Sequence, residues 1–207
     1  MLQQSDYDSI GVVATHCDTR KLVIAENEAL NFDLKELYCD FWNDLIIIWE
    51  EINAYILAVA ECEADPECST PPTPPENYLY KLRLINGGTY QNCNSKERRF
   101  EGVKRVLLYY SYSRYVILNG FNDTPTGVVQ KINEFSLPTP IKDLQAYADK
   151  YRNMGYASFK DTVGYLCANR DYFTWTDCKL CGCGCSKCSG TKAKGYGLKG
   201  RTITKDV

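Results

Sequence analysis

The sequence of 207 residues contains a single histidine and no phosphate-binding loop of the form G-x-x-x-x-G-K-[ST]. A Ser–His or Cys–His catalytic pair therefore has to use His16, with Cys17 beside it. Gly195, Gly197 and Gly200 do not form a dinucleotide-binding fingerprint, because we expect no strand before them and no helix after them. These absences favour a protein that is not an enzyme. A thiol-dependent enzyme using Cys17 and His16 is the weaker alternative.

Long apolar runs are missing as well. The run Leu45–Trp49 has five residues, whereas a membrane-spanning helix needs about 20. The stretch Met1–Asp8 lacks the basic start and the apolar segment of a secretory signal. We therefore expect maturation in the cytosol and no membrane partner. Apolar residues still make up 44% of the chain and aromatic residues 13%, which is enough for a packed core and excludes wholesale disorder.

Basic residues are scarce in the first part of the chain and acidic residues in the last. Residues 1–77 carry 16 acidic and 3 basic side chains, a net charge of −13, whereas residues 78–177 have a net charge of +5 and residues 178–207 one of +6. In such a chain the acidic part of one copy can bind the basic part of another, or the basic part can bind a polyanion. The same distribution also fits solvated helix faces followed by a basic tail.

Helical periodicity dominates the sequence. We expect a first helix capped by Asp18, a second capped by Asp33, a third beginning at Asn94 or Ser95, and a fourth with Pro140 in its first turn. Their expected ranges are 19–30, 34–59, 95–119 and 141–169.

Between the second and third helices the pattern changes. Five prolines between residues 66 and 75 favour an extended connector. Alternation over Tyr78–Ile85 predicts a strand that turns at Gly87–Gly88 and pairs with Thr89–Gln91. We expect a turn over residues 122–127 and an irregular or helical link over 128–137.

The predicted fold class is mainly α: a small bundle of about four helices with a β-hairpin-like projection and an extended Cys-rich basic C-terminal tail. Residues 1–170 form the helical domain, with 60–95 as a projecting Pro-rich loop and hairpin, and residues 171–207 form the tail.

Aromatic residues recur at helical spacing in the second and third helices, which are apolar on more than one side. Core packing and subunit packing both explain this pattern, and the neighbouring Lys104 and Arg105 also allow a surface on which nucleic-acid bases stack. We take packing as the better explanation. The candidate oligomer or partner interface consists of Trp42, Trp49, Tyr109, Tyr112 and Tyr115.

The tail contains two C-x-x-C pairs, whose four thiolates match the tetrahedral set of a structural zinc site. Only three residues separate the pairs, whereas ordinary zinc ribbons leave about a dozen or more. A site this compact is strained, or borrows a ligand from Cys167 or from another subunit. A reduced, metal-free tail is the alternative. The candidate zinc ligands are Cys178, Cys181, Cys185 and Cys188.

Two other features of the cysteines and the tail are relevant. The chain has 11 cysteines, an odd number, so complete disulfide pairing within one chain is impossible. Cys62 and Cys68 flank a proline-containing turn and can approach each other.

The end of the tail resembles a cationic arm that lies along phosphates or acidic protein, including the first 77 residues of a neighbouring copy. The candidate contacts to DNA or to an acidic partner are Lys192, Lys194, Lys199 and Arg201.

Three segments, Leu84–Tyr90, Phe100–Val116 and Thr126–Lys131, resemble the neck proteins of tailed bacteriophages, in particular the head–tail connector (ring or adaptor) proteins of crAss-like phages. The tandem helices expected over Leu22–Leu45 are similar to the start of the same family. The resemblance covers residues 18–170 and consists of aromatic and glycine positions, without a catalytic signature. The Cys-rich tail lies outside the family pattern.

The resemblance implies a non-enzymatic virion component, assembled in the host cytoplasm and located in the neck at the capsid portal vertex. Members of that family look like helical bundles that form a ring, usually twelve-fold, under the portal. The implied partners are further copies of the chain, the portal protein, the adjacent neck or tail protein, and the genomic DNA in the channel. The resemblance implies no cofactor. A zinc-knuckle nucleic-acid-binding protein that uses the tail is the alternative function.

Overall fold

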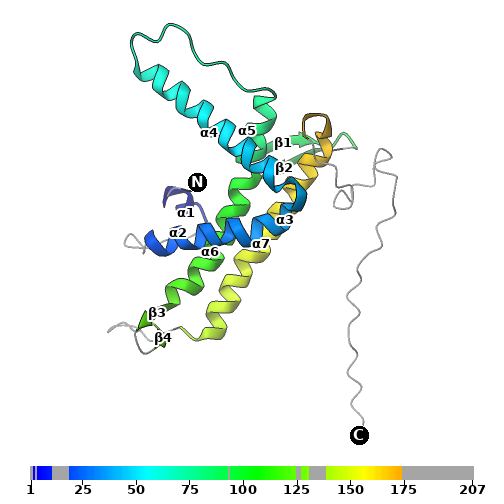
Figure 1. Cartoon of the computed structure of the whole chain (residues 1–207). Coiled ribbons are helices and arrows are strands. Elements are labelled where there is room, and N and C mark those ends of the chain that lie inside the picture. Colours follow the sequence, from blue (N-terminus) through cyan, green and yellow to red (C-terminus); the bar gives the residue numbers. More distant parts are fainter. Residues whose placement is uncertain are drawn as a thin grey trace.

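The computed structural model describes residues 2, 4–10, 19–92, 94–124, 127–130 and 139–173, and these residues are mainly helical (Figure 1). The fold class expected from the sequence is thereby confirmed, while the tail lies outside the described residues. The helices are α1 (Gln4–Asp8), α2 (Thr19–Glu28), the π-helix η1 (Ala29–Leu34), α3 (Lys35–Tyr38), the 3₁₀ turn η2 (Cys39–Phe41), α4 (Trp42–Ala64), α5 (Tyr78–Asn86), α6 (Gly102–Gly120), α7 (Ile141–Ala168) and the 3₁₀ turn η3 (Arg170–Tyr172). The strands are β1 (Gly88–Gln91), β2 (Glu97–Phe100), β3 (Phe121–Thr124) and β4 (Gly127–Gln130).

α6 is the central helix of the fold. Every side chain from Val103 to Tyr115 is buried except those of Lys104, Arg105 and Arg114. A helix that is apolar on all sides needs cover on all sides. α2 crosses α6, α7 runs along it, and α5 packs against it (Figure 1).

The core consists of two clusters around α6. The larger one joins the first half of α4 and α5 to the start of α6 and the end of α7, and Phe100 stacks on Tyr165 within it at 4.3 Å between ring centroids. The smaller one joins α1 and α2 to the second half of α6, where the rings of Tyr112 and Tyr151 meet edge to face at 4.6 Å. Offset and edge-to-face ring pairs each contribute about 0.5–1.5 kcal/mol beyond their burial.

Two glycines fix the junction between α5 and α6. Gly87 has φ +85° and Gly102 has φ +78°, a conformation that costs about 1–2 kcal/mol for residues with a side chain. A Cβ atom on Gly102 would lie 2.3 Å from the Gly87 backbone nitrogen. The end of α5 can therefore rest directly on the start of α6 only because both residues lack a side chain.

Two sequence-based predictions around α5 are wrong. Residues 78–85 form the helix α5 instead of a strand, and Thr89–Gln91 belongs to β1, which pairs antiparallel with β2 (Gly88 with Phe100, Gln91 with Glu97). α6 starts at Gly102, because β2 occupies the residues after the proposed cap at Asn94 or Ser95. The alternating residues of 78–85 also satisfy a helical repeat, and burial of Leu84 and Ile85 against the core favours the helix.

Asp33 does not cap a second helix. α2 continues through η1 into α3, and the chain breaks helical geometry at Cys39, which has φ +44°. Asp33 is instead buried and forms ion pairs.

The region after α6 also differs from the prediction. Residues 121–124 (β3) pair antiparallel with residues 127–130 (β4), so the chain reverses direction within the predicted turn, whereas residues 128–130 form a strand in place of the expected link. The first and last of the four expected helices agree closely with the structure, since α2 covers Thr19–Glu28 and α7 covers Ile141–Ala168.

Candidate functional site

The second half of α4 leaves the helical body and forms a projection that we call the arm (residues 54–79). α4 buries Leu45, Ile48 and Ile52, and no residue of α4 beyond Ile52 is buried. Ile56 is 45% exposed and Leu57 61% exposed. Figure 1 shows α4 running outward and residues 65–77 returning to α5. The arm therefore presents apolar side chains that its own chain does not cover.

The arm is also acidic. Residues 54–79 contain five acidic side chains and no basic one, and all five are exposed. They are Glu61, Glu63, Asp65, Glu67 and Glu76.

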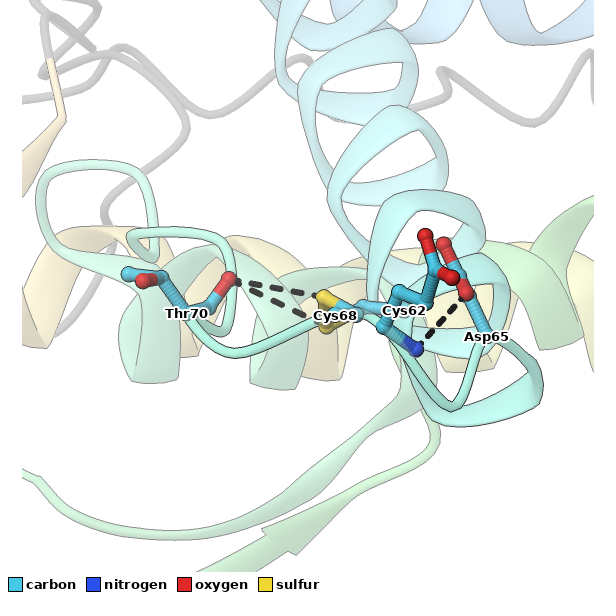
Figure 2. The surroundings of a disulfide bond; sticks show 5 residues. Cys62, Asp65, Cys68 and Thr70 are labelled. Carbon is cyan, nitrogen blue, oxygen red and sulfur yellow. Dashed lines mark hydrogen bonds between the residues drawn. A yellow bond between two sulfur atoms is a disulfide. The ribbon is translucent and has the colours of Figure 1, made fainter.

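A disulfide bond between Cys62 and Cys68 closes the turn at the end of α4 (Figure 2). Their Cα atoms lie 5.3 Å apart, within the usual range for a disulfide. The Thr70 carbonyl oxygen lies 3.6 Å from the sulfur of Cys68, and the Asp65 carboxylate accepts the backbone N–H of Glu67 at 2.9 Å. The approach of the two cysteines expected from the sequence is confirmed.

The base of the arm is fixed by one ion pair and one ring contact. Lys81 Nζ donates to Glu51 Oε2 at 2.6 Å, joining α5 to α4. The rings of Tyr55 and Tyr78 meet edge to face with centroids 4.7 Å apart. These contacts hold the two helices together where the arm begins.

The β1–β2 hairpin follows α5 (Figure 1) and carries three exposed basic side chains and one exposed acidic side chain, that of Glu97. Together with one residue of α5 these basic side chains make up a set that we call the basic face, and all of its members are exposed. Arg98 and Arg99 are successive residues of β2, so their side chains point to opposite sides of the hairpin. The basic face consists of Arg83, Lys96, Arg98 and Arg99.

Trp42 and Trp49, two of the predicted interface residues, line one apolar groove of about 200 Å³. Both side chains are half-buried. Leu30 and Ile46 also line the groove, Val103 and Leu107 of α6 contribute to it, and Glu26 and Glu50 are its charged residues.

The three predicted interface tyrosines lie elsewhere. Tyr109, Tyr112 and Tyr115 are each at least 93% buried within the single chain, and they belong to the smaller core cluster. Their packing contributes to the fold of one copy, and the structure does not place them with the two tryptophans. Contact with a second copy stays a prediction.

Asp33 organises a polar site that the sequence analysis missed. Arg114 Nε donates to Asp33 Oδ2 at 2.6 Å, and Arg114 Nη1 donates to Glu28 at 3.0 Å. Arg152 Nη2 donates to Asp33 Oδ1 at 3.4 Å. The carboxylate is 6% exposed, and it connects η1 to both α6 and α7. The one signal in the sequence was Arg114, a charged residue within the apolar face of its helix.

This polar site borders an open cavity of about 460 Å³ between α6 and α7. The hydrogen bond to Asp33 raises the pKa of Arg114, so the guanidinium is charged at all accessible pH values. Burial, and secondarily the Asp33 carboxylate, raises the pKa of Tyr110 to about 12. Because the arginines already bind carboxylates of the chain, the geometry indicates a structural site.

The remaining predicted site residues lie outside the described residues. They are His16 and Cys17, the four candidate zinc ligands Cys178, Cys181, Cys185 and Cys188, and the cationic residues Lys192, Lys194, Lys199 and Arg201. Within the part of the chain that the structure describes, no three His, Cys, Asp or Glu side chains are placed to hold a metal ion. In that same part, no helix is long and apolar enough to cross a membrane.

The fold and these surfaces define a mainly helical protein with an acidic arm and a basic face. By sequence, the chain belongs to the Family of unknown function (DUF6712), whose model matches residues 75–184. The match includes α5, the β1–β2 hairpin, α6 and α7, and it begins near the end of the arm. No curated protein and no solved structure matches the chain.

Proposed function

We propose that the protein is a structural, non-enzymatic subunit of the neck of a tailed bacteriophage. Copies form a ring that joins the capsid portal to the tail and extends the DNA channel. The resemblance of Leu84–Tyr90, Phe100–Val116 and Thr126–Lys131 to head–tail connector proteins of crAss-like phages supports the virion context. Support for assembly comes from two surfaces of the chain, the arm and the basic face.

The observation that carries the proposal is the arm. Ile56 and Leu57 lie on a helix that projects from the body, and the single copy leaves them 45% and 61% exposed. Burying a fully exposed Ile or Leu side chain contributes about 1.5–3 kcal/mol, and about half of that remains to be gained at each of these two positions. A partner that covers both therefore gains substantial free energy from a part of the molecule that does not hold the fold together.

The partner that fits the arm is a second copy of the chain. The five acidic side chains of the arm are opposite in charge to the four basic side chains of the basic face, and along the chain the arm leads into α5 whereas the hairpin follows it (Figure 1). Because the two surfaces differ, the contact between copies is heterologous. Such a contact, repeated by a rotation that closes on itself, builds a ring. The resemblance implies twelve copies and a portal protein above the ring.

The first experiment measures assembly of the full chain. Its mass is followed by light scattering at increasing protein concentration, alone and with the portal protein, and the particles are imaged by negative-stain microscopy. We expect rings. The double variant Ile56→Asp/Leu57→Asp should remain a single chain, with at least a 100-fold higher concentration needed for assembly and an unchanged thermal unfolding midpoint.

The matched control is Val23→Asp/Ile24→Asp on α2, because these residues are 56% and 48% exposed but lie outside the arm. This variant should assemble like the unmodified chain. Assembly of the arm variant would overturn the proposed contact. A chain that stays single with the portal present would overturn the ring itself, and affinity of that single chain for both zinc and DNA would favour the zinc-knuckle alternative.

A charge exchange tests the pairing of the two surfaces. Arg98→Glu/Arg99→Glu should weaken assembly, and adding Glu61→Arg/Glu63→Arg to it should restore assembly, since both partners then have opposite charges again. Assembly of the charge-exchanged chain that stays as weak as that of the first variant would show that the arm does not meet the basic face.

A further inference from the structure

The groove lined by Trp42 and Trp49 is not used by the proposed ring contact. It is an apolar groove of about 200 Å³ between η1 and α4, with α6 beneath. Its two charged lining residues are Glu26 and Glu50, and no basic residue lines it. Glu26 is buried and accepts the backbone N–H of Leu2 at 2.9 Å, whereas Glu50 is exposed.

This lining specifies the chemistry of an occupant. An apolar side chain suits the apolar lining that includes Trp42 and Trp49, and a cation next to it in sequence suits the exposed carboxylate of Glu50. The surroundings reinforce this preference, because residues 43–77 contain eight acidic side chains and no basic one. An acidic segment is therefore repelled, and a basic segment with isolated apolar residues is favoured.

The chain itself contains such a segment beyond the described residues. Residues 174–207 carry seven basic and two acidic side chains. Within them, Leu198 is flanked by Gly197 and Lys199, so an apolar side chain and a cation are adjacent and the preceding residue adds no bulk.

We propose that the C-terminal segment docks in this groove in the same copy, with Leu198 between Trp42 and Trp49 and Lys199 beside Glu50. The docking surface is thus intramolecular and distinct from the ring contact. It holds the basic end of the chain against the acidic helix α4.

The length of the segment permits this arrangement. The described chain ends at Phe173, which is buried in the same core cluster that Trp42 and Trp49 pack against. Leu198 follows 25 residues later, and an extended chain of that length spans up to about 80 Å. A compact body of this size has a radius of gyration of about 16 Å, so the segment can pass around it. Tethering also raises the effective concentration of the segment, commonly to the millimolar range.

Fluorine NMR of the full chain labelled with 5-fluorotryptophan tests the docking. The chain has three tryptophans, and single Trp→Phe variants assign their signals. At a concentration where the chain is a single copy, Leu198→Asp should shift the signals of Trp42 and Trp49. The matched variant Ile203→Asp, which changes another apolar residue of the same segment, should leave both signals in place.

Two further measurements address the occupant. A synthetic peptide of residues 194–203 should bind the Leu198→Asp chain at least 10-fold more tightly than the unmodified chain, whose groove is already filled. A water-soluble carbodiimide should join Lys199 to Glu50 within one chain, and this product should disappear in the Glu50→Gln variant.

Three results would overturn the docking. They are unchanged Trp42 and Trp49 signals in Leu198→Asp, equal shifts in the Ile203→Asp control, and signals that depend on protein concentration, which indicate a second copy in the groove. None of these results depends on whether rings form, because the measurements are made on the single chain.

Discussion

Replacing Asp33 by alanine should destabilise the fold through loss of its contacts with Arg114 and Arg152. A hydrogen bond between charged groups contributes about 1.5–3 kcal/mol, which applies to the 2.6 Å contact with Arg114. The contact with Arg152 is 3.4 Å long and Arg152 is 61% exposed, so it adds at most about 0.5 kcal/mol. Arg114 keeps Glu28 as a partner at 3.0 Å, which prevents the larger loss expected for an unpaired buried charge.

We therefore expect Asp33→Ala to lower the free energy of unfolding by about 2–3 kcal/mol, measured by urea denaturation with circular dichroism. For a chain of this size each kcal/mol corresponds to about 2–4 °C, so the thermal midpoint should fall by about 4–12 °C. The control is Asp161→Ala, because Asp161 is an exposed carboxylate on α7; it should change the stability by less than about 0.5 kcal/mol.

A double-mutant cycle isolates the ion pair itself. The coupling energy of Asp33 with Arg114 should be about 1.5–3 kcal/mol, and that of Asp33 with Arg152 should be below about 0.5 kcal/mol. A coupling with Arg114 below about 0.5 kcal/mol, or a loss below about 0.5 kcal/mol in Asp33→Ala, would refute the conclusion that this carboxylate joins η1 to α6.

Three further predictions concern the fold and the arm. Gly102→Ala should cost about 3 kcal/mol or more in urea denaturation, because its Cβ would lie 2.3 Å from backbone and its φ is +78°; a loss below about 1 kcal/mol would contradict the close junction of α5 with α6. Burial raises the pKa values of Tyr110 and Tyr112 to about 12 from 10. The stability that their neutral forms provide is thus complete below pH 10 and is lost as the pH rises to about 12. Absorbance at 295 nm should show delayed ionisation in the folded protein, and ionisation of all tyrosines near pH 10 without unfolding would disprove it. Cys68→Ser should accelerate proteolysis within residues 65–77 and change global unfolding by less than about 2 kcal/mol, because the loop closed by Cys62 is short; a collapse of the whole fold would show that the arm belongs to the core.

An element can be predicted from the sequence where its apolar pattern favours one periodicity over its whole length. α7 has 28 residues, and its apolar stripe is long enough to favour one periodicity. α5 has only nine residues, over which alternation and a helical repeat fit equally well. Its conformation is decided by contacts far along the chain, such as the hydrogen bond from the Tyr165 hydroxyl to the Tyr80 carbonyl at 3.0 Å.

Asp33 illustrates a second limit. Aspartate three residues before a glutamate is a good local signal for a helix start, and Glu36 stands at that position. The partner that holds Asp33 inside the fold lies 81 residues away. A local sequence pattern cannot reveal a contact between residues so far apart in the chain, so the pattern around Asp33 predicts a helix cap. Only the charge of Arg114 within an apolar face indicated that a buried carboxylate had to exist somewhere else in the chain.

The burial of the aromatic residues also changes which residues are expected at the contact between copies. The aromatic pattern of the sequence predicts an oligomer or partner interface that includes the tyrosines of α6. Tyr109, Tyr112 and Tyr115 are covered by their own chain, so a variant there lowers stability and assembly together. Ile56 and Leu57 are uncovered and lie past the last buried residue of α4. Substitutions at these two positions can therefore change the contacts between copies while the fold of each copy stays intact. Variants of the arm thus give the clearest test of the ring proposal.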